Sequence, residues 1–208
     1  MKIPRTYAIR NKYRVVEDIL RDVEGSLLDV GARDRRLAAE LNPERLQYYS
    51  ADVSGGHDYR LDLEQKLDLP DQAFDYVVAL DVLEHVEHIH QAFHELARIA
   101  RRSLIVGLPN MATLSRRWLF LWHGHLDTQK YDLGLEHPGD RHRWLTVYPQ
   151  INAFVEANGP RASFNLERVV EQIEGRYVFR AMAYPVVRAG LLPAGWLTGR
   201  CIYVMTRR

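Results

Sequence analysis

The feature that most constrains the fold of this sequence is the segment 74–107, where two apolar runs flank a helical pattern. The runs FDYVVAL (74–80) and SLIVG (103–107) are typical of strands that are buried on both faces. Between them, apolar residues recur at steps of three and four, which is the period of an amphipathic helix. Those residues are Val86, Ile89, Phe93, Leu96 and Ala100. A strand, a helix and a strand in this order predict parallel strands joined by a crossover helix.

Weaker patterns of the same kind occupy the rest of the chain. Helices are predicted at 14–23, 35–41 and 149–158, and strands at 26–30, 46–52 and 59–63. The last two strands are predicted at 167–173 and 201–205, as a hairpin with a long loop. Alternating strands and helices predict an α/β fold whose mostly parallel sheet carries helices on both faces.

Composition limits the alternatives. A chain of 208 residues can bury an ordinary core, so residues 1–208 are expected to form one domain. The formal net charge of +1 argues against a strongly basic nucleic-acid binder. The single cysteine makes no internal disulfide and suits a reducing cytosol. Charges and prolines interrupt the most apolar stretch, 181–205, and the N-terminal region lacks an apolar signal core. We therefore expect a cytoplasmic protein with no membrane span.

A candidate binding site lies where the first two predicted strands of the parallel sheet end. Gly31 follows one strand directly, and Asp52 ends the next, 21 residues later. Nucleotide-binding α/β folds place an acidic residue about 20 residues beyond a glycine turn, where its carboxylate accepts hydrogen bonds from ribose hydroxyls. The glycine signal alone also fits a plain turn from a strand into a helix. Both residues lie at carboxyl ends of strands, where such sheets form their binding crevice.

The order of five motifs resembles the class I S-adenosylmethionine-dependent methyltransferases. The most specific motif is FDYVVALDVLEHV, because this family often carries FDxVxxxxVLEHV at that place. The resemblance covers residues 26–110 in good register and the remainder more loosely. It implies a Rossmann-like, seven-stranded sheet with an antiparallel last strand. The motifs are DVGARDRRL (29–37), YYSADVSG (48–55), YRLDLE (59–64), FDYVVALDVLEHV (74–86) and SLIVGLPN (103–110).

The resemblance also implies a cofactor, S-adenosylmethionine, with S-adenosylhomocysteine as product. Asp29 matches the family's acidic residue near the methionine amino group. Gly31 and Ala32 match the turn that passes the methionine part of the cofactor. Asp52 matches the acid that binds the ribose, and Val53 lies beside the adenine.

Four further residues match the family pattern. Asp62 and Leu63 correspond to the pair that meets the adenine edge. Leu80 and Asp81 correspond to the end of the fourth strand, beside the reacting centre. The LEH turn that follows (83–85) is also part of the family pattern, where packing roles are common.

The chain departs from the family in two places. Arg33 and Arg35 stand where the family usually has glycines, and a missing glycine can forbid a positive φ angle. The Arg33 side chain either crowds the cofactor carboxylate or pairs with it. The turn PGG that often precedes the fifth strand is replaced by ARR (100–102). These departures bear on cofactor affinity more than on the fold.

Residues 111–148 interrupt the alternation and are interpreted as a lid or a substrate-facing insertion. Within it, 116–122 is interpreted as an amphipathic helix covering the sheet rather than as a surface that stacks on nucleic acid. We take His142 as a candidate general base, because its unperturbed pKa is about 6.5. The alternative is that this region only packs and forms ion pairs. The candidate substrate-binding residues are His125, Tyr131, Arg141, Arg143 and Trp144.

The resulting hypothesis is methyl transfer to a small-molecule acceptor that the sequence does not name. One alternative is a weak or inactive cofactor-binding protein that acts through a partner, suggested by the altered glycine turn. Another is an enzyme acting on a lipid or lipid-linked sugar at a membrane surface, because the predicted loop 184–196 is apolar. Local packing explains that loop equally well. The sequence predicts no metal site, since it has no thiolate cluster and His90 and His94 are interpreted as a polar helix face.

Overall fold

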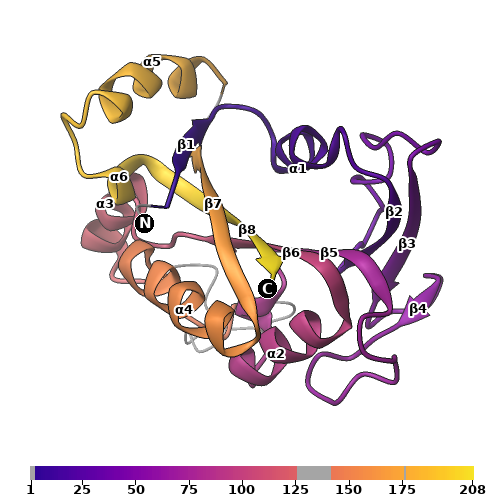
Figure 1. Ribbon diagram of the computed structural model, residues 1–208. Helices are drawn as coiled ribbons and strands as arrows, with labels where there is room; N and C mark the ends of the chain where they lie inside the picture. The colour runs from indigo at the N-terminus through magenta and orange to yellow at the C-terminus, as the bar shows by residue number, and fades with distance from the viewer. Residues whose placement is uncertain (1–2, 126–141, 176) are drawn as a thin grey trace.

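The computed structural model describes residues 3–125, 142–175 and 177–208 (Figure 1). The strands are β1 (Arg5–Ala8), β2 (Gly25–Val30), β3 (Leu46–Asp52), β4 (Tyr59–Arg60), β5 (Phe74–Leu80), β6 (Ala100–Pro109), β7 (Phe164–Ile173) and β8 (Thr198–Arg207). The helices are α1 (Lys12–Leu20), the short 3-10 helix η1 (Leu83–His85), α2 (Ile89–Ile99), α3 (Leu114–His123), α4 (Tyr148–Arg161), α5 (Tyr177–Arg188) and α6 (Ala194–Leu197).

The described strands form one sheet in the order β1-β7-β8-β6-β5-β2-β3-β4. Only β8, among these strands, runs antiparallel to its neighbours, β6 and β7. The predicted Rossmann-like, mostly parallel sheet with an antiparallel last strand is therefore confirmed. The sheet has eight strands rather than the expected seven, because β1 adds to its edge by pairing with β7.

Helices cover both faces of the sheet, as predicted. Val16 of α1 packs in a cluster with Val78 of β5, whereas Phe93 of α2 and Val155 of α4 pack in a second cluster with Val77. Neighbouring residues of β5 thus point to opposite faces, which is the side-chain alternation of a strand. Figure 1 shows α1 on one side of the sheet and α2 and α4 on the other. Because both faces are covered, all seven residues of β5 are buried.

The segment predicted as a helix at 35–41 is instead a series of turns. Its hydrogen bonds join residues three apart, as from the Ala38 amide to the Arg35 carbonyl. Arg33 and Arg35 have φ angles of 44° and 53°, which a right-handed helix does not allow. The two apolar residues at helical spacing, Leu37 and Leu41, are nevertheless buried against the sheet. The turns therefore place both side chains in the core, as a helix would.

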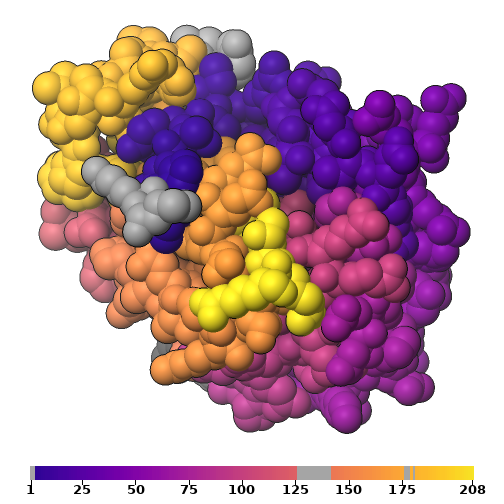
Figure 2. Space-filling view, viewed as in Figure 1, coloured from indigo at the N-terminus to yellow at the C-terminus, as the bar shows by residue number. Residues whose placement is uncertain are grey.

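The predicted loop between the last two strands contains α5 and α6. Ala183, Val187 and Leu197 form a small separate cluster with Ile173 of β7. In Figure 2, this part of the chain forms a lobe beside the N-terminal strand. The local packing expected for this segment is present, while Leu191 remains 73% exposed. A contact with lipid or with another subunit stays a prediction.

The predicted insertion begins with α3, which differs from the expectation of a helix that covers the sheet. No residue of α3 is buried, and Trp118 and Trp122 are exposed and pack against each other edge to face. The apolar residues follow one another around the helix, so no single face can take them all into the core. After His125, residues 126–141 lie outside the described part of the chain.

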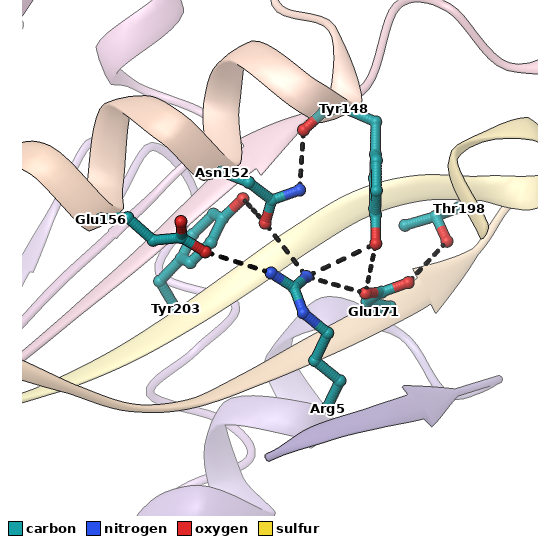
Figure 3. A network of polar contacts seen from close by, with 7 residues as sticks. All are labelled: Arg5, Tyr148, Asn152, Glu156, Glu171, Thr198 and Tyr203. Atoms are coloured by element: carbon teal, nitrogen blue, oxygen red, sulfur yellow. Dashed lines mark hydrogen bonds and ion pairs between the residues drawn. The ribbon is translucent and has the colours of Figure 1, made fainter. Parts of the chain in front are cut away.

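A buried polar network joins the edge strand β1 to α4, β7 and β8 (Figure 3). The side chain of Glu171 is fully buried and accepts hydrogen bonds from Arg5 (3.0 Å), Tyr148 (2.7 Å) and Thr198 (3.1 Å). The Arg5 guanidinium also reaches Asn152 (3.1 Å). The network anchors the start of α4, and with it the chain that returns from the insertion to the sheet.

Candidate functional site

A cleft of about 760 Å³ opens at the carboxyl ends of β2, β3 and β5. This volume is within the range of small-molecule sites, roughly 300–1,000 Å³. The predicted site residues that line the cleft are Gly31, Arg33, Asp52, Val53, Asp62, Leu63, Leu80, Asp81, His142 and Arg143. The structure therefore brings together residues from five separate parts of the sequence.

The turn at Gly31 requires a glycine for two reasons, its backbone angle and its packing. Gly31 has φ 73°, and the amides of Gly31 and Ala32 both donate to the Ala51 carbonyl. A Cβ atom at Gly31 would lie 2.4 Å from Val82 Cγ2, so only glycine lets Val82 pack this closely against the turn. Two details differ from expectation: no helix begins here, and Ala32 is buried rather than lining the cleft.

The two arginines that replace family glycines do adopt positive φ angles, so the missing glycines do not forbid that conformation. Contacts of the turn offset the cost of the left-handed region, which is about 1–2 kcal/mol per residue. The Arg33 amide donates to Asp52 (3.3 Å), and the Arg35 guanidinium donates to the Gly56 carbonyl (2.6 Å). Arg33 lines the cleft beside Gly31.

Asp52 ends β3 with its carboxylate at the edge of the cleft. Burial favours the neutral form of this carboxyl, but hydrogen bonds from Ser54 and from the Arg33 amide outweigh burial and lower its pKa. Asp52 is therefore ionised at neutral pH and accepts hydrogen bonds. This is the chemistry that a pair of ribose hydroxyls requires.

Asp29 lies beneath the turn and does not line the cleft. It is 5% exposed and accepts a hydrogen bond of 2.8 Å from the Tyr48 hydroxyl. Burial raises the pKa of Asp29 to about 6, despite that hydrogen bond. The sequence-based role near an amino group stays a prediction, and the structure adds a packing role under the Gly31 turn.

The side of the cleft matched to adenine is formed by Val53, Asp62 and Leu63. Val53 is 60% exposed, although it is apolar and lies at the cleft. Asp62 accepts a hydrogen bond from the Glu64 amide (3.0 Å), which fixes the turn after β4. An exposed apolar side chain can pack against the face of an adenine ring, and a fixed carboxylate can accept a hydrogen bond from its edge.

Asp81 is held by two cations that the sequence did not indicate. Its carboxylate contacts Arg200 through two hydrogen bonds of 2.6 Å and Lys12 at 2.8 Å. Burial opposes ionisation, but these charges outweigh burial and hold the pKa of Asp81 below its usual range. Arg200 reaches the site because β8 pairs with β6, and Lys12 begins α1. Sequence spacing carries no signal of either contact.

Glu84 belongs to the LEH turn, and the sequence assigned no specific role to it. Its side chain is fully buried, and neither carboxylate oxygen has a hydrogen-bond partner among the described residues. Burial and the nearby charge of Asp81 raise the pKa of Glu84 to about 8. His85 Nε2 lies 3.9 Å and His142 Nε2 lies 3.8 Å from Glu84 Oε1.

The end of the insertion is fixed on η1. The backbone carbonyl of Glu84 accepts hydrogen bonds from the amides of Arg143 (2.8 Å) and Trp144 (3.2 Å). The Arg143 guanidinium pairs with Glu64 at 2.6 Å, which matches the ion-pair alternative. The Trp144 indole donates to the Val86 carbonyl and does not line the cleft.

The remaining predicted substrate residues are not brought into the cleft by the described part of the chain. His125 is exposed and stacks on His123, with ring centroids 6.2 Å apart. Tyr131 and Arg141 lie outside the described residues.

Comparisons with known proteins agree with the fold. The sequence profile of a methyltransferase-domain family matches residues 5–150. No curated protein matches the chain. A possible histamine N-methyltransferase from Thermotoga maritima superposes with TM-score 0.61 at 17% identity, covering 97% of this chain and 90% of that one. A magnesium protoporphyrin IX methyltransferase from Synechocystis, crystallised with S-adenosylhomocysteine, gives TM-score 0.59 at 18% identity, covering 94% and 82%.

A third structure is the 1,6-didemethyltoxoflavin N1-methyltransferase of Burkholderia thailandensis, with its substrate and S-adenosylhomocysteine bound. It gives TM-score 0.56 at 12% identity, covering 96% of this chain and 77% of that one. The mostly parallel sheet with its antiparallel last strand is the fold of class I methyltransferases. The chain belongs to the methyltransferase-domain family. Among the described residues, no helix is long and apolar enough to cross a membrane.

Proposed function

We propose that this protein transfers the methyl group of S-adenosylmethionine to an oxygen, nitrogen or carbon atom of a small molecule. The observation that carries the proposal is that the glycine turn after β2 and an ionised acid at the end of β3 line one cleft. Gly31 and Arg33 line the cleft from the turn after β2, and the Asp52 carboxylate beside them accepts a hydrogen bond from the Arg33 amide. Small-molecule methyltransferases among the structural neighbours support this reading.

The residues of the cleft fit the cofactor. Asp52 would accept hydrogen bonds from the ribose hydroxyls, and Val53, Asp62 and Leu63 would surround the adenine. Arg33, beside the glycine turn, offers a guanidinium to the methionine carboxylate. When bound, the cofactor supplies a methyl group that its sulfonium charge already makes electrophilic.

The work left to the chain is to hold an acceptor in line with that methyl group, which is catalysis by positioning. Both ends of the insertion contribute to the cleft, through Arg116 on one side and His142 and Arg143 on the other. We therefore propose that residues 111–148 face the acceptor. His142 is the candidate base for an acceptor that must lose a proton.

Calorimetric titration with S-adenosylmethionine and S-adenosylhomocysteine tests this proposal. Asp52→Ala removes charged hydrogen bonds worth about 1.5–3 kcal/mol, so affinity should fall about 10- to 100-fold. Asp71→Ala, at an acid whose side chain is 76% exposed and outside the cleft, is the matched control and should bind like the original protein. Equal affinity of the Asp52 variant would place the cofactor elsewhere. Transfer of labelled methyl to a panel of small acceptors then separates an enzyme from a protein that only binds the cofactor.

A further inference from the structure

The cleft contains a second feature that cofactor binding does not use: a carboxylate and two imidazoles that converge on one point. Glu84 and His85 come from η1, and His142 comes from the far end of the insertion. One ligand atom of each residue lies within 4.8 Å of the other two. The sequence predicted no metal site, and the two histidines at helical spacing, His90 and His94, lie on α2 outside this cluster.

The backbone holds the three side chains together. The amides of Arg143 and Trp144 donate to the Glu84 carbonyl, so the residue before them, His142, is fixed against η1. The His85 and His142 rings meet edge to face, with centroids 4.8 Å apart. The cluster is thus assembled by hydrogen bonds that do not involve the candidate ligand atoms.

The environment of Glu84 is the main evidence for a bound cation at this cluster. A fully buried carboxyl group that makes no hydrogen bond is costly in either protonation state, and its ionised form also needs a cation. Among the described residues, no donor lies within hydrogen-bond distance of either Glu84 oxygen. The imidazole nitrogens, at 3.8 and 3.9 Å, are too far for hydrogen bonds. Asp81 cannot take part, because Lys12 and Arg200 already hold its carboxylate.

The spacing of the cluster suits a cation in its centre. Ligands about 2.1 Å from a tetrahedral ion lie about 3.4 Å apart. The two distances from Glu84 to the imidazoles, 3.8 and 3.9 Å, would need to shorten by a few tenths of an ångström. The three ligand atoms lie within 4.8 Å of one another, so the two imidazoles would also need to move closer together. Two histidines and one carboxylate are the ligands of catalytic metal sites, which leave a coordination position open.

We propose that Glu84, His85 and His142 bind one divalent transition-metal ion, with zinc the best match. Imidazole nitrogens favour zinc and its neighbours over magnesium and calcium, which prefer oxygen ligands. The open position would face the cleft, since all three residues line it. An acceptor with an oxygen or nitrogen donor could then coordinate there, and His142 would serve as a ligand rather than a base. Only this last point, on the acceptor, rests on the proposed function.

Metal binding can be measured without cofactor. The full-length protein is stripped with a chelator and titrated with Zn²⁺, Co²⁺, Mn²⁺ and Mg²⁺ by calorimetry, with Co²⁺ absorption as a direct readout of nitrogen ligands. We expect one Zn²⁺ per chain, bound more tightly than Mg²⁺. Glu84→Gln and His142→Gln should each weaken Zn²⁺ binding about 100-fold or more, beyond the 10- to 100-fold typical of residues behind the ligands.

His94→Gln is the matched control, because His94 is an exposed histidine of α2 that packs against Phe93. It should bind Zn²⁺ like the original protein. Circular dichroism reports whether each variant folds, and His142→Gln, at a side chain that is 16% exposed, decides the matter if Glu84→Gln does not fold. No Zn²⁺ binding, tighter binding of Mg²⁺, or equal binding by the His142 variant would overturn the proposal. Since these titrations contain no S-adenosylmethionine, their outcome is independent of the Asp52 experiment.

Discussion

In the ion pair between Arg5 and Glu171 the two side chains differ in burial, so we expect the two single substitutions to differ in their effect on the free energy of unfolding. The Glu171 side chain is fully buried, whereas that of Arg5 is 32% exposed. Removing the arginine leaves an unpaired charge in the interior, which costs about 3–5 kcal/mol when both partners are buried. Because Arg5 is partly exposed, we expect Arg5→Met to lower the free energy of unfolding by about 3 kcal/mol.

The opposite substitution should cost less. Glu171→Gln keeps a polar group for Tyr148 and Thr198 and leaves no buried charge. Arg5 keeps Glu156 at 3.3 Å and is accessible to water. A neutral group in place of a charged hydrogen-bond partner costs about 1–2 kcal/mol. We therefore expect Glu171→Gln to be less destabilising than Arg5→Met.

Urea denaturation of four variants tests this reasoning. Arg14→Met is the control, because Arg14 pairs with Glu40 on the surface and is 61% exposed; such pairs contribute about 0–1 kcal/mol. In the double variant of Arg5→Met and Glu171→Gln, the second change should restore part of the stability lost in the first. The reasoning is refuted if Arg5→Met costs no more than the control, or if the double variant is less stable than Arg5→Met alone.

Two further predictions concern the Gly31 turn. The folded-state pKa of Asp29, about 6, lies above its ordinary 3.8, so the folded state binds the proton more tightly and stability falls as pH rises from 4 to 6. Asp29→Asn should raise the free energy of unfolding at pH 7.5 by about 1–3 kcal/mol and by little at pH 4; an equal effect at both pH values contradicts the assignment. Gly31→Ala should lower stability by about 2 kcal/mol or more, because it combines a positive φ with a contact to Val82. Thermal melting beside Gly55→Ala, where a Cβ meets open space, checks this; equal melting temperatures would show that the turn relaxes.

Local sequence determined the elements that place the cofactor side of the cleft. Strands β2, β3, β5 and β6 and helix α2 have apolar periods strong enough to be read directly, because each buries its own face. Parallel strands put their carboxyl ends at one edge, so Gly31, Asp52 and Leu80 had to meet there. The turns at 33–40 show the limit of this reading. Buried leucines at helical spacing are also satisfied by turns, once Arg33 and Arg35 take positive φ angles.

Only the tertiary structure decided which distant groups share the other side of the cleft. Strand β1 is four residues long and pairs with β7. Its Arg5 side chain forms an ion pair with the buried Glu171, a contact that no local pattern predicts. Arg200 reaches Asp81 because β8 lies beside β6. His142 meets Glu84 because two backbone amides after it donate to one carbonyl of η1. Periodicity records what each segment buries, whereas these contacts depend on which segments become neighbours, and that is set by the packing of the whole chain.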